Sequence, residues 1–294
     1  MRKTLFHAAL LAACLPLGAA AQPAERAAGH EFGARFSSSG AAALDGAEPG
    51  AEAGVATYQL SWRGRAALGA GTTALLGLEW SRHELDRIGA TWLPENLKSL
   101  TAQLGVAHRF DARWRLLVNA APRIAGADGD LRDARADLSV LALASYDANA
   151  DLRWSIGLRY GARSDRKLLP IAGVVWCFAP EWELCLAWPE SGVSYRATEA
   201  LTLRSLASIF GGDYRFAHDP RPAGARSGPS WRGGWLELRE VRAGLAAEYA
   251  FAARYALRLE SGYVVDRRFE FMQRGLELSA DGALYGTLGL TARF

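Results

Sequence analysis

The last segment of the chain, residues 284–294, alternates between apolar and polar or small positions. One face carries Leu284, Gly286, Leu288, Leu290, Ala292 and Phe294, and the other carries Tyr285, Thr287, Gly289, Thr291 and Arg293. A strand that crosses an outer membrane has about 9 to 11 residues, and its lipid-facing and lumen-facing side chains alternate. The pattern therefore predicts a membrane-spanning strand with an apolar outer face and a polar inner face.

The same period of two recurs along the rest of the chain. It is clearest in segments 152–161, 240–249 and 255–268, where arginine, glutamate and glycine oppose leucine, tyrosine and valine. Further candidate strands are 29–38, 54–63, 73–82, 99–110, 113–121, 136–145, 169–178, 181–188, 192–197 and 201–215. Together these segments make fourteen strands. The pattern is weakest at 29–38, at 136–145, whose leucines do not choose a face, and at 192–197, so twelve strands is the alternative.

The connections between these segments alternate in length. Short ones are expected at 111–112, 147–150, 179–180, 198–200 and 250–253, and long ones at 83–98, 122–135, 161–168, 216–234 and 271–283. Outer-membrane barrels alternate short periplasmic turns with longer extracellular loops in this way. Only 189–191, a tight turn where a loop is due, departs from it. Because lipid cannot satisfy an open sheet edge, 284–294 is expected to pair with 29–38 and close the barrel.

The first 21 residues are typical of a secretory signal peptide. Arg2 and Lys3 supply a positive start, an apolar stretch follows, and Ala19-Ala20-Ala21 forms a small-residue cleavage site before Gln22. An alternative is lipoprotein processing at Cys14. The signal predicts export, and residues 22–294 are expected to form one outer-membrane barrel domain of a Gram-negative bacterium.

Composition narrows the class further. No run of 18 apolar residues follows the signal, which argues against a membrane-spanning helix, yet half of the residues are hydrophobic and ten are tryptophan. A soluble β-sandwich or a set of αβ units leaves the aromatic residues at segment ends unexplained, whereas a barrel uses them as interfacial girdles. Removing Arg2 and Lys3 lowers the formal charge from +3 to about +1, a balance that does not suggest a nucleic-acid partner.

Several short motifs resemble an uncharacterised family of bacterial outer-membrane β-barrel proteins, a domain of unknown function. They are Leu169-Pro170-Ile171, Val174-Val175-Trp176, Ala179-Pro180-Glu181-Trp182-Glu183-Leu184, Trp188-Pro189, Val193-Ser194-Tyr195-Arg196, Gly211-Gly212-Asp213-Tyr214-Arg215 and Arg267-Arg268-Phe269. The resemblance rests mainly on the second half of the chain. It implies the barrel fold and the outer-membrane location, and it brings no catalytic residues or cofactor.

The predicted lumen face is rich in charged residues, and it is the main candidate site. The candidates are Arg153, Arg159, Arg196, Arg204, Arg242, Glu248, Arg258, Glu260, Asp266 and Arg293, with Arg63, Arg109, Arg115, Glu79, Glu183 and Glu240 on the same face by alternation. Ladders of arginine and carboxylate across strands would fill and stiffen the barrel, which is the preferred interpretation. An excess of arginine would otherwise favour anions in a water-filled pore.

Two cysteines, Cys177 and Cys185, flank the predicted turn at Ala179-Pro180. A disulfide between them suits the oxidising periplasm. A two-residue turn, however, places Cys177 opposite Trp182, so bridging to Cys185 requires a longer turn or a bulge. A bond and two buried thiols remain equal alternatives, and two cysteines alone do not form a metal site.

An outer-membrane enzyme of the phospholipase or deacylase type is the alternative function. Such an enzyme needs a serine and a histidine with a third residue that orients the histidine. The candidate histidines are His30 at a strand start, His83 and His218 in predicted loops, and the lipid-facing His108. No Ser-Asn-Gly motif of the phospholipase kind lies nearby. We therefore predict a non-enzymatic barrel for small-solute passage or structural support.

The predicted partners follow from the location. Phe294 ends the strand that the barrel-insertion machinery would bind, and tryptophans at strand ends would anchor the protein in outer-membrane lipids. The loop at 216–234 is rich in proline, glycine and arginine, so it is expected to be irregular. It is interpreted as mobile, with a plug in the lumen or a binding site for lipopolysaccharide phosphates as alternatives.

Overall fold

The structure is a computed structural model that describes residues 28–89, 92–129, 131, 134–162, 167–221, 230–280 and 282–294. The predicted signal peptide, residues 1–21, lies outside the described residues. So does the Pro222 to Pro229 part of the loop predicted at 216–234. None of the described helical segments is long and apolar enough to cross a membrane.

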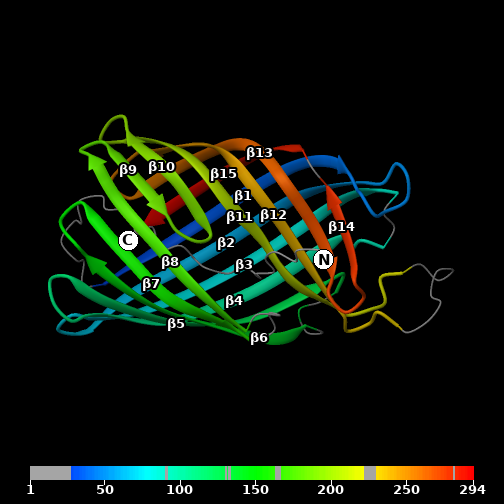
Figure 1. The fold of residues 1–294 in the computed structure, drawn as a ribbon, viewed down its shortest axis with the longest axis horizontal. Coiled ribbons are helices and arrows are strands. Elements are labelled where there is room, and N and C mark those ends of the chain that lie inside the picture. Colours follow the sequence, from blue (N-terminus) through cyan, green and yellow to red (C-terminus); the bar gives the residue numbers. More distant parts are fainter. Residues whose placement is uncertain are drawn as a thin grey trace, which may run out of the picture.

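Fifteen strands form one closed sheet (Figure 1). They are β1 (Ala28–Ala43), β2 (Glu52–Gly69), β3 (Thr72–Ile88), β4 (Asn96–Arg109), β5 (Trp114–Ala127), β6 (Arg135–Asp147), β7 (Leu152–Gly161), β8 (Leu168–Ala179), β9 (Trp182–Leu186), β10 (Glu190–Arg196), β11 (Leu201–Phe216), β12 (Trp235–Ala250), β13 (Tyr255–Phe271), β14 (Leu276–Ala280) and β15 (Ala283–Arg293). β14 and β15 follow one another along the same side of β13 and share one place in the wall. The fold is therefore the predicted antiparallel barrel of fourteen strands, not twelve.

The last strand closes the barrel as its alternation predicts. β15 pairs with β1 from Glu31 opposite Arg293 to Ser39 opposite Tyr285. His30 and Phe294 exchange two backbone hydrogen bonds, His30 N to Phe294 O at 2.9 Å and Phe294 N to His30 O at 2.8 Å. These bonds satisfy the backbone of both terminal strands, so the sheet has no free edge where they meet.

The outer face of the wall is apolar and exposed. The side chains of Leu284, Leu245 and Ile156 are 73%, 68% and 67% exposed, and their sequence neighbours on the other face are less so. Other exposed members of this face are Phe32, Leu60, Leu76, Leu104, Trp154, Leu158, Trp176, Leu259, Tyr263, Leu288 and Leu290. A water-soluble monomer rarely exposes so large a continuous apolar surface.

One end of the barrel carries short turns and the other carries the longer connections. In the turn after β4, the Asp111 carboxylate accepts hydrogen bonds from the backbone N–H groups of Arg113 and Trp114, each at 2.7 Å. These bonds fix the turn and hold the pKa of Asp111 below its usual range. At the other end the loops are shorter than predicted, because β3 continues to Ile88 and β14 lies within the loop expected at 271–283.

The barrel is not equally wide along its axis. At the loop end, β11 pairs in parallel with β5, Arg215 opposite Gly126 and Phe216 opposite Ala127. This contact bypasses β6–β10 and encloses a narrower ring of β1–β5 and β11–β14. We call this ring the filled section, and the turn-side part enclosed by all the strands the wide section.

Candidate functional site: the barrel interior

The filled section is packed with apolar side chains. Inward-facing residues at the loop ends of its strands form one buried cluster. Its larger members are Leu44, Val55, Leu85, Leu93, Leu97, Tyr214, Phe216, Leu236, Leu238, Val264, Phe269, Phe271, Leu278 and Tyr285. Interiors packed in this way leave no continuous aqueous path. Among the described residues, this cluster therefore fills the loop end of the barrel interior.

An aromatic cluster caps this core. Trp92, from the loop between β3 and β4, and Trp231, from the loop between β11 and β12, lie with ring centroids 5.8 Å apart. Both rings also contact Phe271, which stacks on Phe216 at 5.8 Å. The described ends of the predicted 216–234 loop are thus docked on the end of the barrel.

An ion pair fastens the start of this loop. Arg221 donates to the Asp219 carboxylate through Nε at 3.0 Å and Nη2 at 2.8 Å, and its guanidinium lies 5.2 Å from the centroid of the Trp231 ring. The backbone N–H of Trp231 also donates to Asp219, at 3.1 Å. The Arg221 guanidinium holds the pKa of Asp219 well below its usual range.

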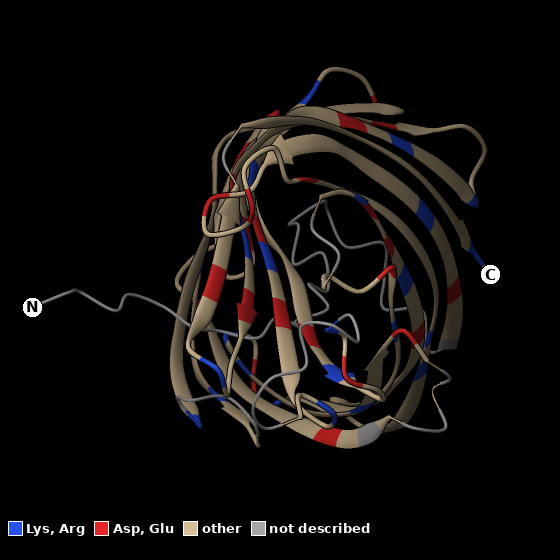
Figure 2. Cartoon of the chain, turned by 90° about the vertical axis from the view of Figure 1, so that its right-hand side faces the viewer, with Lys and Arg blue, Asp and Glu red and all other residues tan. Residues whose placement is uncertain are grey.

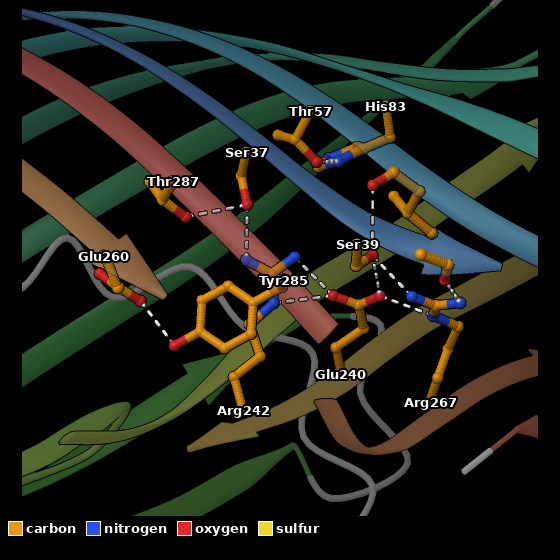
Figure 3. Close-up of polar contacts among 12 residues, drawn as sticks. Ser37, Ser39, Thr57, His83, Glu240, Arg242, Glu260, Arg267, Tyr285 and Thr287 are labelled. Carbon is orange, nitrogen blue, oxygen red and sulfur yellow. Dashed lines mark hydrogen bonds and ion pairs between the residues drawn. The ribbon is translucent and has the colours of Figure 1, made fainter. Parts of the chain in front are cut away.

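A buried ion-pair cluster lies beneath the apolar core (Figure 3). Glu240 on β12 is 0% exposed and accepts from Arg267 Nε at 2.6 Å and from Arg242 Nη2 at 2.5 Å. Ser39 Oγ also donates to Glu240, at 3.1 Å, and Arg267 Nη2 donates to Ser39 at 2.6 Å. A carboxylate with two guanidinium partners and a hydroxyl has its hydrogen bonds satisfied. Removal of any one charged member would leave a buried charge without its partner, so the cluster is stable only when all of its charged members are present.

The cluster extends across the barrel to β15. Arg242 Nη1 donates to Ser37 Oγ at 2.9 Å, and Thr287 Oγ1 donates to the same oxygen at 3.0 Å. The Arg242 guanidinium also lies 4.2 Å from the Phe210 ring centroid and 4.9 Å from that of Tyr285. Contacts between residues more than 200 positions apart therefore tie β1, β12 and β15 together inside the barrel.

Histidine 83 is buried in the same region. It lies on β3, not in the loop where the sequence places it, and its Nδ1 is 2.9 Å from Thr57 Oγ1. Its ring packs edge-on against Phe210 and Tyr214. His108 pairs in a similar way with Thr72, at 2.8 Å. Neither histidine has the serine and carboxylate partners of a hydrolytic triad among these contacts.

In the wide section the charged residues form ladders across neighbouring strands. Asp147 accepts from Arg115 at 2.7 Å and from Arg153 at 2.5 Å. Glu31 accepts in the same way from Arg63 at 3.1 Å and Arg293 at 3.0 Å. These pairs are partly exposed, unlike those around Glu240. Figure 2 shows such basic and acidic positions around the wall.

A longer ladder joins β10, β11, β13 and β15. Glu190 on β10 accepts from Arg204 at 2.8 Å and lies 3.6 Å from Arg258, which donates to Glu260 at 2.7 Å. Tyr285 Oη donates to the other Glu260 oxygen at 2.9 Å. Most lumen arginines therefore have carboxylate partners, the arrangement expected of structural filling.

The remaining candidates occupy separate places. Arg159 is half-buried on β7, Arg196 is exposed near a turn, and Glu248 is exposed on β12. The register places these three on the face of the inward-pointing Arg204 and Arg258. They add charged groups to the inner face of the wall, but they do not form one compact site with the ladders.

The predicted lumen position of Asp266 is wrong. The alternation predicts it on the lumen face, but the pairing of β12 and β13 shifts by one residue between Val241 and Arg242. Beyond this bulge Arg267, not Asp266, is the fully buried residue, and Asp266 contacts Arg268 at 3.0 Å and Arg239 at 3.5 Å on the other face. A β-bulge inserts one residue and reverses every later side chain, so the sequence pattern missed Arg267.

Cys177 and Cys185, the two cysteines among the described residues, are free in the structure. Cys185 lies opposite Val175, and the pairing of β8 with β9 is irregular between Trp176 and Ala179, beside Cys177. The Cys177 thiol lies 4.0 Å from a Glu183 carboxylate oxygen. Among the described residues, no group of three or more histidine, cysteine or acidic side chains could hold a metal ion.

No protein-family model and no curated protein sequence matches this chain. The resemblance to an uncharacterised barrel family therefore rests on the sequence motifs, and of what it implies only the barrel fold is confirmed.

Several solved structures resemble the barrel. The toluene transporter TodX of Pseudomonas putida is 11% identical, with 92% of this chain and 91% of that chain covered and a TM-score of 0.46. A FadL homologue of Pseudomonas aeruginosa is 10% identical, with 91% of this chain and 89% of that chain covered and a TM-score of 0.44. The translocator domain of the autotransporter NalP of Neisseria meningitidis is 14% identical, with 91% of this chain and 88% of that chain covered and a TM-score of 0.38.

Proposed function

We propose that the chain is an integral outer-membrane barrel that gives small solutes passive access to an arginine-lined lumen. The observation that carries the proposal is the continuous exposed apolar face around the wall, with the charged residues gathered inside it. Lipid is the solvent that such a face requires. The predicted signal peptide and the terminal Phe294 agree with export and with insertion by the barrel machinery.

A charge placed on the outer face tests the location. Leu245 is 68% exposed, so Leu245→Arg would change the stability of a water-soluble barrel little. In lipid the same change is expected to cost about 2–4 kcal/mol near the bilayer midplane. Glu199→Arg, at an exposed turn, is the control. Recovery in the outer-membrane fraction and heat-modifiable migration on a gel are the readouts. Equal tolerance of both substitutions, or a soluble product, would contradict the proposal.

The packed core defines what kind of channel this is. Because the filled section blocks the axis, the purified barrel is expected to show little steady conductance in planar bilayers. The turn-side lumen with its partly exposed arginines would then be open toward the periplasm. A large constant conductance would show that the axial path is open and would overturn this part of the proposal.

The lipid-modifying enzyme gains no support from the geometry. The Thr57–His83 pair is enclosed by Phe210 and Tyr214, so an ester in the membrane could not reach it. Release of fatty acid from phospholipid by the purified barrel, abolished by His83→Ala, would reverse this conclusion.

A further inference from the structure

Two neighbouring parts of the wall lack a strand between them. The pairing of β8 with β9 ends at Val174 opposite Leu186, and that of β10 with β11 ends at Glu190 opposite Ser208. β8 nevertheless runs on to Leu168, and β11 runs on to Phe216. Ile209 N–H still donates to Pro189 O at 3.0 Å, and Gly173 still lies against Ala187. The gap above the short β9–β10 hairpin therefore lies between residues 168–172 and 210–214, and Figure 1 shows β8 and β11 diverging there.

The course of β11 keeps this gap from closing. Its end turns away from β8 and pairs with β5, and Arg123 Nη1 of β5 donates to the Asp213 carbonyl at 2.8 Å. Asp213 lies on the outward face by register yet is only 3% exposed, within electrostatic range of Arg159 and Asp137. The end of β11 thus passes inside the wall formed by β6 and β7 and does not stand beside β8.

An interrupted wall in lipid has a physical consequence. Backbone groups without a strand partner are tolerated at membrane depth only where protein covers them or where they line a cavity that water can enter. The outer residues beside the gap are apolar, since Leu168 is 61% and Leu158 54% exposed. The gap therefore lies between a lipid-facing surface and the barrel interior.

The interior beside the gap is more apolar than the charged ladders of the wide section. Inward-facing Leu141, Arg159 and Leu169 lie opposite one another on β6, β7 and β8, and the next row is Leu143, Gly157 and Ile171. Leu141 and Leu143 belong to the predicted segment 136–145, whose leucines do not follow a period of two. The structure gives the reason, because both faces of β6 are apolar.

A small cavity adjoins this apolar stripe. It has a volume of about 60 Å³, and its lining includes Leu117, Leu141 and Ile171 together with Arg63, Arg65 and Arg159. Apolar walls with a few polar groups are the usual lining of a site for a molecule that has an apolar body and a polar end. Guanidinium groups match an anionic end.

From this juxtaposition we propose that the gap between β8 and β11 is a lateral portal. A single-chain amphiphile with an anionic head passes through it between the outer membrane and the lumen. The chain moves along the leucine stripe of β6–β8, and the head moves toward the arginines of the wide section. The proposal rests on the proposed function, because it names the solute class and the route for the same lumen.

Sealing the gap tests the portal. In a Cys177→Ser, Cys185→Ser background, the outward-facing Leu168→Cys on β8 and Ile209→Cys on β11 are joined by bis-maleimides of increasing length. The control is Ala243→Cys with Tyr263→Cys, which are directly paired on β12 and β13 and remote from the gap. The readout is entry of tritiated dodecyl sulfonate, below its micellar concentration, into proteoliposomes. A permanently charged head keeps passage through the lipid itself slow.

The expected result is that the Leu168–Ile209 cross-link lowers uptake to the rate of protein-free vesicles, whereas the control cross-link leaves it unchanged. Uptake that survives the portal cross-link would overturn the proposal. So would a folded, membrane-inserted barrel that takes up no sulfonate at all, and in that case the outer-membrane location would still stand. A soluble product would instead defeat the proposed function.

A second measurement needs no substitution. A dodecyl sulfonate that carries a photoactivatable diazirine on its chain is illuminated with the unmodified protein, and the labelled residues are identified by mass spectrometry. The portal predicts labels at Leu141, Leu143, Leu169 and Ile171. Labels confined to outward residues such as Leu245 and Leu284 would show a probe held only in the surrounding lipid or detergent, and would contradict the proposal.

Discussion

Two carboxylates on one strand show how differently the filled and wide sections treat the same residue type. Glu240 and Glu248 both lie on β12 and both face inward, eight positions apart. Glu240 is completely buried between two guanidinium groups, whereas Glu248 is exposed. The interior of a barrel widens with the number of strands around it. In the narrower filled section inward side chains meet across the axis, and in the wide section they line a solvated wall.

The comparison separates two kinds of stabilisation. In the filled section, apolar packing and a complete buried ion-pair cluster act together, so the loss of one member leaves others unpaired. In the wide section, most charged groups are partly exposed and their partners are replaceable by water, with the buried Glu260 as an exception. The filled section is therefore expected to control the stability of the barrel, and the wide section the character of the lumen.

The largest expected effect is at Glu240. Glu240→Ala leaves Arg242 and Arg267 buried without their shared carboxylate, which is expected to cost about 3–5 kcal/mol of folding free energy. Urea unfolding in vesicles, followed by heat-modifiable migration, measures the loss. The matched control is Glu248→Ala on the same strand, for which little change is expected. A small effect at Glu240 would mean that water reaches the cluster.

Phe269 tests the apolar part of the filled section. It is fully buried in the core, and Phe269→Ala is expected to cost about 3–4 kcal/mol through lost burial and the cavity that remains. Leu143→Ala, an inward but only half-buried residue of the wide section, should cost less. If both substitutions cost the same in unfolding experiments, the two sections do not differ in packing.

A smaller effect is expected in the ladder of the wide section. Arg115→Ala removes one of the two guanidinium partners of Asp147, and Arg153 keeps the other contact. The expected loss of folding free energy is about 1 kcal/mol or less, since both partners are partly exposed. Arg65→Ala, which removes an exposed lumen arginine, is the control. A loss as large as that of Glu240→Ala would show that this ladder is sealed from water.

The smallest expected effect is a pH dependence at the loop that caps the core. The pKa of Asp219 is lowered by Arg221, so the contact is fully present above the usual aspartate pKa of about 4. It is lost as the pH falls through the lowered value. The amide proton shifts of Arg221 and Trp231 should titrate there, and Asp219→Asn should abolish the step. A titration at the ordinary aspartate pKa would contradict the contact.

Much of the fold could be inferred from alternation alone. A period of two, together with connections of alternating length, predicts the fourteen strands and the closure of β15 on β1, because both depend on local pattern and on the demand that lipid leaves no open edge. The ladders of Arg153, Arg204, Arg258 and Glu260 follow from the same pattern. Their side chains lie on the predicted face and find partners on adjacent strands.

Three features depended on the tertiary structure. The bulge between β12 and β13 moves Asp266 outward and buries Arg267, and a single unpaired residue leaves no signal in hydrophobicity. The contact of β11 with β5 narrows one end of the barrel and turns inward-facing positions into a core. The short β9–β10 hairpin leaves the gap beside β8. Each is decided by which strands meet across the barrel, a long-range property that the order of residues along one strand does not contain.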